Sequence, residues 1–157
     1  MTGKPTKKSA AKQPAPVKTS AGKKAEFGRV QFMDAAIADL HDIKKRALPV
    51  LREVFTALKR LDQGELRPTP LKDFGKTGDL SDCGKIVVET DGHPEYRIVV
   101  RDLGSTFEIS EVVTVEERAE DLAYLLAGVR LGRIAEPIRR SDTERKIARI
   151  RKLRGNS

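Results

Sequence analysis

The sequence has no tryptophan, one cysteine and two histidines, and only 4% of its residues are aromatic. A single cysteine, Cys83, cannot form an internal disulfide, which favours a reducing compartment, and we expect a cytoplasmic protein. Two histidines and one cysteine are too few to build a Cys/His zinc finger or ribbon. The composition therefore predicts neither a structural metal of that kind nor a cofactor.

Long hydrophobic runs are also missing. The longest uncharged, mostly apolar stretch covers the eight residues 122–129, whereas a membrane-spanning helix needs about 20. The first residues contain lysines but no apolar h-region, so a secretory signal is not expected. We therefore expect no membrane association.

The net charge of +8 is distributed unevenly along the 157 residues. Residues 1–25 hold seven lysines and no acid, and residues 136–157 hold eight basic and three acidic side chains. These segments contribute +7 and +5, which leaves −4 for residues 26–135. The chain is therefore predicted to consist of a basic tail, a mildly acidic folded domain and a basic C-terminal extension.

The two basic segments have different compositions. Residues 1–25 are rich in Lys, Ala, Pro and Ser, cannot bury enough apolar surface to fold, and are predicted to be disordered. This tail either adds non-specific affinity for RNA or DNA or serves only to keep the chain in solution. In the extension, Ser141 and Glu144 match a capping box. Apolar residues then recur every three positions among basic ones, at Ile147, Ile150 and Leu153.

This pattern predicts a short amphipathic helix in the extension. Its apolar face either docks on its own domain or contacts a partner or RNA.

The first half of the central segment, 26–135, predicts a helical hairpin. A weak strand signal at 27–32 precedes a helix that begins at Asp34. Pro49 is tolerated only in a first helical turn, so a second helix is expected from Pro49 to about Asp62. Two amphipathic helices joined by a short turn form an antiparallel pair.

The second half of this segment predicts a small sheet. Residues 64–82 are rich in Gly, Pro, Asp and Thr and read as an irregular link. Alternating β-branched residues then predict strands at 85–90, 96–101 and 106–115, with connections short enough for an antiparallel meander. A helix is expected over 118–133. The predicted class is α+β, with the helical hairpin packed on a small antiparallel sheet and a C-terminal helix.

The sequence contains no glycine-rich phosphate loop, no GxSxG elbow and no HExxH motif. What remains is three cations and one phenol, at Lys85, Arg97, Arg118 and Tyr124. If the fold brings them to one face, the cations could stabilise a pentacoordinate phosphorane without a metal, and the phenol could take a proton from a ribose 2′-OH. In the alternative interpretation, the strand cations only face water and Tyr124 only packs.

Three segments carry a resemblance to a known family. They are Cys83-Gly84-Lys85-Ile86-Val87-Val88, Tyr96-Arg97-Ile98-Val99-Val100, and Val115 to Tyr124, in which Arg118 precedes Tyr124 by six residues. Together with the helical hairpin, this ordered set resembles the RelE/ParE toxin superfamily, and most closely its RelE branch. The resemblance covers roughly residues 26–133, and only the ordered set, not any single motif, has specificity.

This resemblance implies a RelE-like fold and the toxin component of a type II toxin–antitoxin system. Toxins of the RelE type are metal-independent endoribonucleases that cleave mRNA on the ribosome and inhibit translation. By implication, Lys85 binds phosphate or takes part in proton transfer, Arg97 stabilises the transition state, and Arg118 orients or neutralises the scissile phosphate. Tyr124 is the implied general base, or stacks on a base. A cognate antitoxin is the implied protein partner.

Two departures from the family pattern keep alternatives open. Val87 stands where some RelE toxins have a second lysine, and four acids lie near the implied phosphate site, at Glu116, Glu117, Glu120 and Asp121. Acids there oppose RNA binding. The alternatives are a ParE-like toxin that inhibits DNA gyrase, and a non-catalytic module of the same fold that binds nucleic acid or protein through its basic tails.

Overall fold

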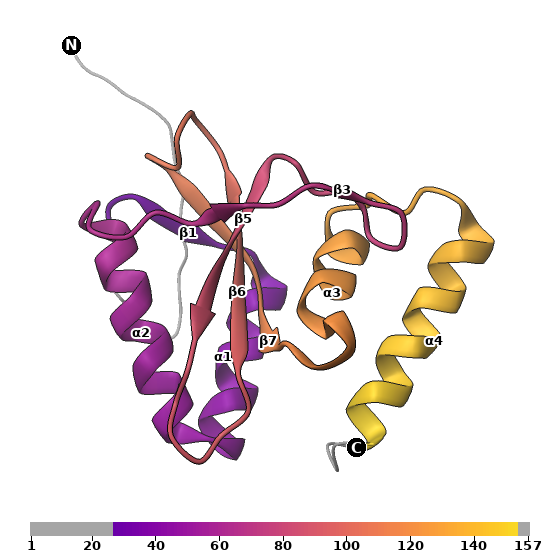
Figure 1. Cartoon of the computed structure of the whole chain (residues 1–157), viewed down its shortest axis with the longest axis horizontal. Helices are drawn as coiled ribbons and strands as arrows, with labels where there is room; N and C mark the ends of the chain where they lie inside the picture. Colours follow the sequence, from indigo (N-terminus) through magenta and orange to yellow (C-terminus); the bar gives the residue numbers. More distant parts are fainter. Residues whose placement is uncertain (1–26, 154–157) are drawn as a thin grey trace.

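A five-stranded mixed sheet forms the centre of the molecule (Figure 1). The computed structural model describes residues 27–153; the predicted tail at 1–25 and the last four residues of the extension lie outside them. The strand order is β1-β7-β6-β5-β2. The strands are β1 (Val30–Phe32), β2 (Thr69–Pro70), β5 (Cys83–Val88), β6 (Tyr96–Asp102) and β7 (Ser110–Glu117).

Strands β5, β6 and β7 form the predicted antiparallel meander. The sheet as a whole is not antiparallel, however, because β1 pairs in parallel with β7. The predicted α+β class is confirmed.

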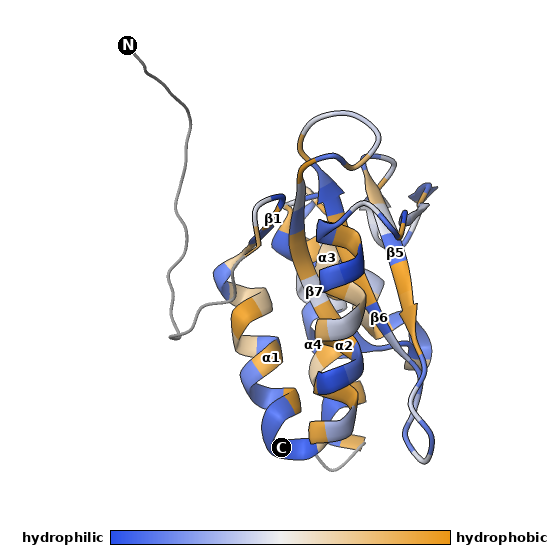
Figure 2. Cartoon of the chain, turned by 90° about the vertical axis from the view of Figure 1, so that its left-hand side faces the viewer, coloured by the Kyte–Doolittle hydropathy of each residue, from blue (hydrophilic) through white to orange (hydrophobic). Residues whose placement is uncertain are grey.

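The predicted helical hairpin is present and covers one face of the sheet (Figure 1). Its helices are α1 (Asp34–Arg46) and α2 (Leu48–Asp62), joined by the single residue Ala47. Pro49 lies in the first turn of α2, where its missing N–H has no helical partner to lose. The strands β5, β6 and β7 are mostly hydrophobic, whereas α1 alternates between hydrophobic and hydrophilic residues (Figure 2). The apolar faces of α1 and α2 are buried against the strands, and this burial holds the hairpin on the sheet.

The opposite face of the sheet is covered by α3 (Leu122–Arg130). The predicted helix at 118–133 is therefore too long. Glu120 and Asp121 adopt left-handed conformations, with φ of 50° and 63°, so a separate 3-10 turn (Ala119–Asp121) precedes α3. Inside α3, a Cβ on Gly128 would lie 2.2 Å from the Thr77 carbonyl oxygen. This glycine allows the link that follows the hairpin to lie directly against α3.

Helix α4 (Pro137–Leu153) lies outside α3, on the side away from the sheet (Figure 1). The predicted cap at Ser141 is wrong, because the helix begins a turn earlier at Pro137 and Ser141 is inside it. Ile147 and Ile150 are buried against α3, so the apolar face docks on its own domain. The third residue of the predicted apolar set, Leu153, is 74% exposed.

The remaining differences concern strand ends. The third strand of the meander begins at Ser110, not at the predicted Thr106, because Thr106 and Phe107 have positive φ and form a turn. Within the link at 64–82, β3 (Asp73–Phe74) and β4 (Gly78–Asp79) form a small separate hairpin. Among residues 27–153, no helix has the length and apolar content needed to cross a membrane.

Candidate active site

The strand register places two of the predicted cations on one face of the sheet. Lys85 pairs with Val99 and Val87 pairs with Arg97 across β5 and β6. Since side chains alternate along a strand, these residues all lie on the face that α3 covers over β6 and β7. Lys85 is partly exposed, and Val87, at the position of the missing second lysine, is 45% exposed.

The central contact joins Arg97 to Tyr124. The Nε of Arg97 donates a hydrogen bond to the Tyr124 hydroxyl at 3.0 Å, across 27 residues of chain. Tyr124 lies in the first turn of α3, which brings it over β6. Arg97 is 8% exposed, so this guanidinium is the least accessible of the three cations. The packing of α3 on the sheet thus creates the phenol–guanidinium pair that the sequence alone could not establish.

Glu95 completes the cluster. Its carboxylate forms an ion pair with Arg97, and its Oε2 lies 3.8 Å from the Nε of Arg118. The backbone N–H of Arg118 also donates to the Glu95 carbonyl oxygen at 3.0 Å. One acidic residue therefore holds two guanidinium groups together at the start of β6. Sequence analysis missed Glu95, although its position two residues before Arg97 is a signal, because residues i and i+2 of a strand share a face.

Three of the four predicted site residues, Arg97, Arg118 and Tyr124, are thus linked directly or through Glu95. The fourth, Lys85, lies on the same face, but within the described residues no carboxylate lies within ion-pair distance of it.

The acidic residues near the site are largely paired with cations. Glu116 lies opposite Arg97 in the register, and its Oε1 accepts a hydrogen bond from Arg151 at 3.0 Å. Glu117 pairs with Tyr96 in the register and therefore faces the helical hairpin, where it lies 3.6 Å from Arg46. Asp121 lies 2.5 Å from Lys76. Glu120 is exposed. These pairs reduce the negative potential that four acids would otherwise impose on bound phosphate.

A buried ion pair fixes α3 relative to the sheet. The strand β1 ends at Phe32, so the outer edge of β7 has no strand partner beyond Val112. There the Asp39 carboxylate accepts the Val115 N–H at 2.9 Å and binds both terminal nitrogens of Arg130, at 2.6 and 2.9 Å. Burial raises the pKa of Asp39, and the contacts with Arg130 oppose that rise.

The remaining titratable candidates do not belong to this cluster. The Cys83 thiol is buried, and this burial raises its pKa to about 12. The hydroxyl of Tyr96 accepts a hydrogen bond from Arg46 at 3.0 Å on the side of the helical hairpin, and burial raises its pKa. In residues 27–153, no group of three or more His, Cys, Asp or Glu side chains is arranged to hold a metal ion.

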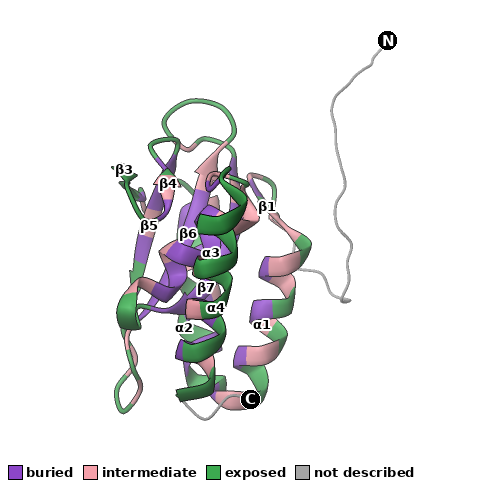
Figure 3. Ribbon diagram, turned by 90° about the vertical axis from the view of Figure 1, so that its right-hand side faces the viewer, coloured by how far each residue is buried: buried purple, intermediate pink, exposed green. Residues whose placement is uncertain are grey.

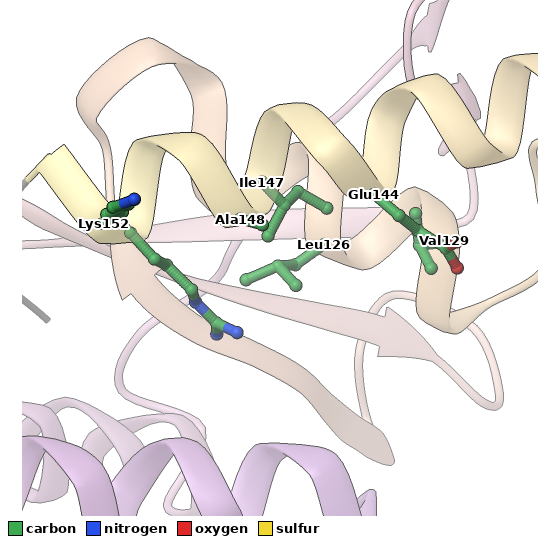
Figure 4. Close-up of a pocket in the computed structure, with 7 residues that line it drawn as sticks. Leu126, Val129, Glu144, Ile147, Ala148 and Lys152 are labelled. Carbon is green, nitrogen blue, oxygen red and sulfur yellow. The ribbon is translucent and has the colours of Figure 1, made fainter. Parts of the chain in front are cut away.

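A second surface feature is an open groove between α3 and α4 (Figure 4). None of the four predicted site residues lines this groove. Its lining consists of apolar side chains of both helices and of charged residues: Leu126, Val129, Glu144, Ile147, Ala148, Arg151 and Lys152. The chemistry-bearing cluster therefore lies on the sheet and at the first turn of α3, not in this groove.

No protein-family model matches the chain, and searches of the curated proteins and of the solved structures found no match either. The candidate site is therefore inferred from the geometry of this chain.

Proposed function

We propose that the chain is a metal-independent endoribonuclease with a RelE-like fold, the toxin component of a type II toxin–antitoxin pair that cleaves mRNA on the ribosome. The observation that carries the proposal is the 3.0 Å contact between Arg97 Nε and the Tyr124 hydroxyl. The order of hairpin, meander and helix supports the fold.

In this mechanism the ribose 2′-oxygen attacks the adjacent phosphorus as the Tyr124 phenolate takes the 2′-OH proton and becomes the phenol. The bond from phosphorus to the 5′-oxygen breaks, which leaves a 2′,3′-cyclic phosphate, and the departing 5′-oxygen receives a proton. Lys85 binds the phosphate or supplies that proton. Arg97 and Arg118 stabilise the negative charge of the phosphorane, which fixed cations do most effectively where water is scarce.

In the structure, Glu95 occupies the guanidinium groups that would bind phosphate. A phosphate and a carboxylate compete for the same guanidinium donors, because both present paired oxygens. An RNA phosphate that reaches Arg97 and Arg118 must therefore displace Glu95 or share its partners. A cognate antitoxin would keep the toxin inactive by covering this face.

The test is inducible expression in a bacterial host, with primer-extension mapping of transcripts. We expect growth arrest and new 5′ ends inside translated regions, and we expect Tyr124→Phe to abolish both. The chain has only two tyrosines, each bonded to an arginine, so Tyr96→Phe is a matched control. If Tyr124→Phe arrests growth and cuts transcripts as the unmodified chain does, the assignment of Tyr124 is wrong.

The burial of Arg97 favours a second candidate, a non-catalytic module of the same fold. A guanidinium that is 8% exposed and paired with Glu95 can be purely structural. This candidate predicts normal growth and intact transcripts on expression. Growth arrest with intact transcripts and an induced DNA-damage response would instead indicate a ParE-like gyrase inhibitor.

A further inference from the structure

Helix α4 is the most basic element of the described chain. Between Pro137 and Leu153 it has seven Lys or Arg residues and two acids. It is also the outermost layer on its side of the molecule, and most of its surface is exposed (Figure 3). Only its inner face is occupied, where Ile147 and Ile150 pack on α3. The outer face is thus a charged surface without a role in the fold.

The cations on this outer face form a stripe. Arg145, Arg149 and Lys152 follow one another at i, i+4 and i+7, so they lie on successive turns of one face of the helix. Lys152 lies at the border of this face, because it also lines the groove between α3 and α4. Arg145 is paired with Asp142. Within the described residues, no carboxylate lies within ion-pair distance of Arg149 or Lys152. These two charges are therefore available to an external anion.

Helix α4 is connected to the candidate site through Arg151. Its Nη2 donates to Glu116 at 3.0 Å, and Glu116 lies opposite Arg97 in the sheet register. The last turns of α4 therefore lie on the same side of the sheet as Arg97 and Tyr124. Lys152 directly follows Arg151, so the C-terminal end of the basic stripe lies next to this contact.

We propose that the outer face of α4, formed by Arg145, Arg149 and Lys152, binds the phosphate backbone of the RNA that enters the candidate site. The choice of RNA rests on the proposed function. The physical basis is counterion release, in which each lysine or arginine that neutralises a phosphate contributes a salt-dependent, sequence-independent increment of affinity. The stripe contributes affinity and not sequence preference.

The test measures binding of a short 2′-O-methyl RNA to the full-length chain by fluorescence anisotropy, as a function of salt. This RNA has no free 2′-OH, so binding is measured without cleavage. We expect the triple variant Arg145→Gln, Arg149→Gln, Lys152→Gln to bind at least about tenfold more weakly at roughly 0.1 M salt, with a salt slope lower by about 2. Glutamine preserves helix propensity, and circular dichroism confirms the fold.

The matched control removes three exposed cations from α2, on the other side of the sheet: Arg52→Gln, Lys59→Gln, Arg60→Gln. It changes the net charge by the same amount, so we expect less than about a threefold loss. Equal losses in the two triple variants, or no loss from the α4 variant, would overturn the proposal. Displacement of the RNA by polyglutamate at equal charge would also overturn it, and would indicate an acidic protein as the partner.

The result is independent of the cleavage test. A chain that binds RNA through α4 but cuts no transcript would contradict the endoribonuclease proposal alone.

Discussion

The Asp39 carboxylate binds both terminal nitrogens of Arg130, at 2.6 and 2.9 Å, across 91 residues of chain. It also accepts the N–H of Val115, so one side chain connects α1, the edge of β7 and the last turn of α3. The helix that carries Tyr124 is therefore fixed at both ends, by Arg97 near its start and by Asp39 near its end.

Removing one partner of this buried pair should be costly. We expect Asp39→Ala to lower the free energy of unfolding by about 3–5 kcal/mol, because Arg130 is left as an uncompensated buried charge. Chemical denaturation monitored by circular dichroism measures this loss. The exposed pair between Arg145 and Asp142 is the control, and Asp142→Ala should cost less than about 1 kcal/mol. Similar losses from both substitutions would contradict a special role for Asp39.

Cys83 should make the fold sensitive to alkali. Its pKa is about 12 in the folded chain against an ordinary value of 9.0, so above pH 9 the unfolded chain loses a proton that the folded chain keeps. Stability contributed by the neutral thiol is complete below pH 9 and lost as the pH rises toward 12. The slope is about 1.4 kcal/mol per pH unit. Denaturation between pH 8 and about 10.5 should show this extra slope in the unmodified chain and not in Cys83→Ala.

Glu95 should limit the affinity of the site for phosphate. We expect Glu95→Gln to increase the affinity for 2′-O-methyl RNA by roughly threefold to tenfold, because the substitution frees Arg97 and Arg118 from a competing carboxylate. The control is Glu89→Gln, an exposed acid after the end of β5 that also removes one negative charge. An unchanged affinity in Glu95→Gln, or the same gain in both variants, would show that Glu95 does not compete with RNA.

Gly128 tests the contact between α3 and the link that follows the hairpin. In an exposed helix, Gly→Ala stabilises by up to about 1 kcal/mol. Here the added Cβ would lie 2.2 Å from the Thr77 carbonyl oxygen, so α3 must move. We expect Gly128→Ala to destabilise by about 1–3 kcal/mol in thermal and chemical denaturation. Gly104→Ala, with nothing within 4 Å of its Cβ, should be nearly neutral.

The elements with clear periodicity could be predicted from the sequence. The apolar stripes of α1 and α2 and the β-branched runs of β5 and β6 identify these elements to within about two residues. The errors occur where local backbone conformation overrides the pattern. Thr106 and Phe107, and then Glu120 and Asp121, adopt positive φ despite having side chains that disfavour it. Tertiary contacts accompany the turns at two of these positions, because Phe107 packs against the hydrophobic core and Asp121 pairs with Lys76.

Four residues of the candidate site were singled out from the sequence, but Glu95 and the contacts among these residues were not. Residue type and order single out Arg97 and Tyr124, whereas their contact depends on the position of α3 across the sheet. Whether Lys85 shares a face with Arg97 depends on the register of β5 against β6, which only the structure provides. The role of Glu95 could not be predicted from the sequence, because it depends on the positions of the two arginines, Arg97 and Arg118, that lie around its carboxylate.

The pairing of β1 with β7 has a consequence for synthesis. Val30 pairs with Ser110, so β1, the first strand within the described residues, is synthesised 80 residues before its partner. At about 5–20 residues per second, this interval is roughly 4–16 s. The helical hairpin also emerges before the meander, and its apolar face stays uncovered until β5, β6 and β7 are synthesised. The nascent chain therefore passes through a partly folded state with exposed apolar surface, to which a chaperone can bind.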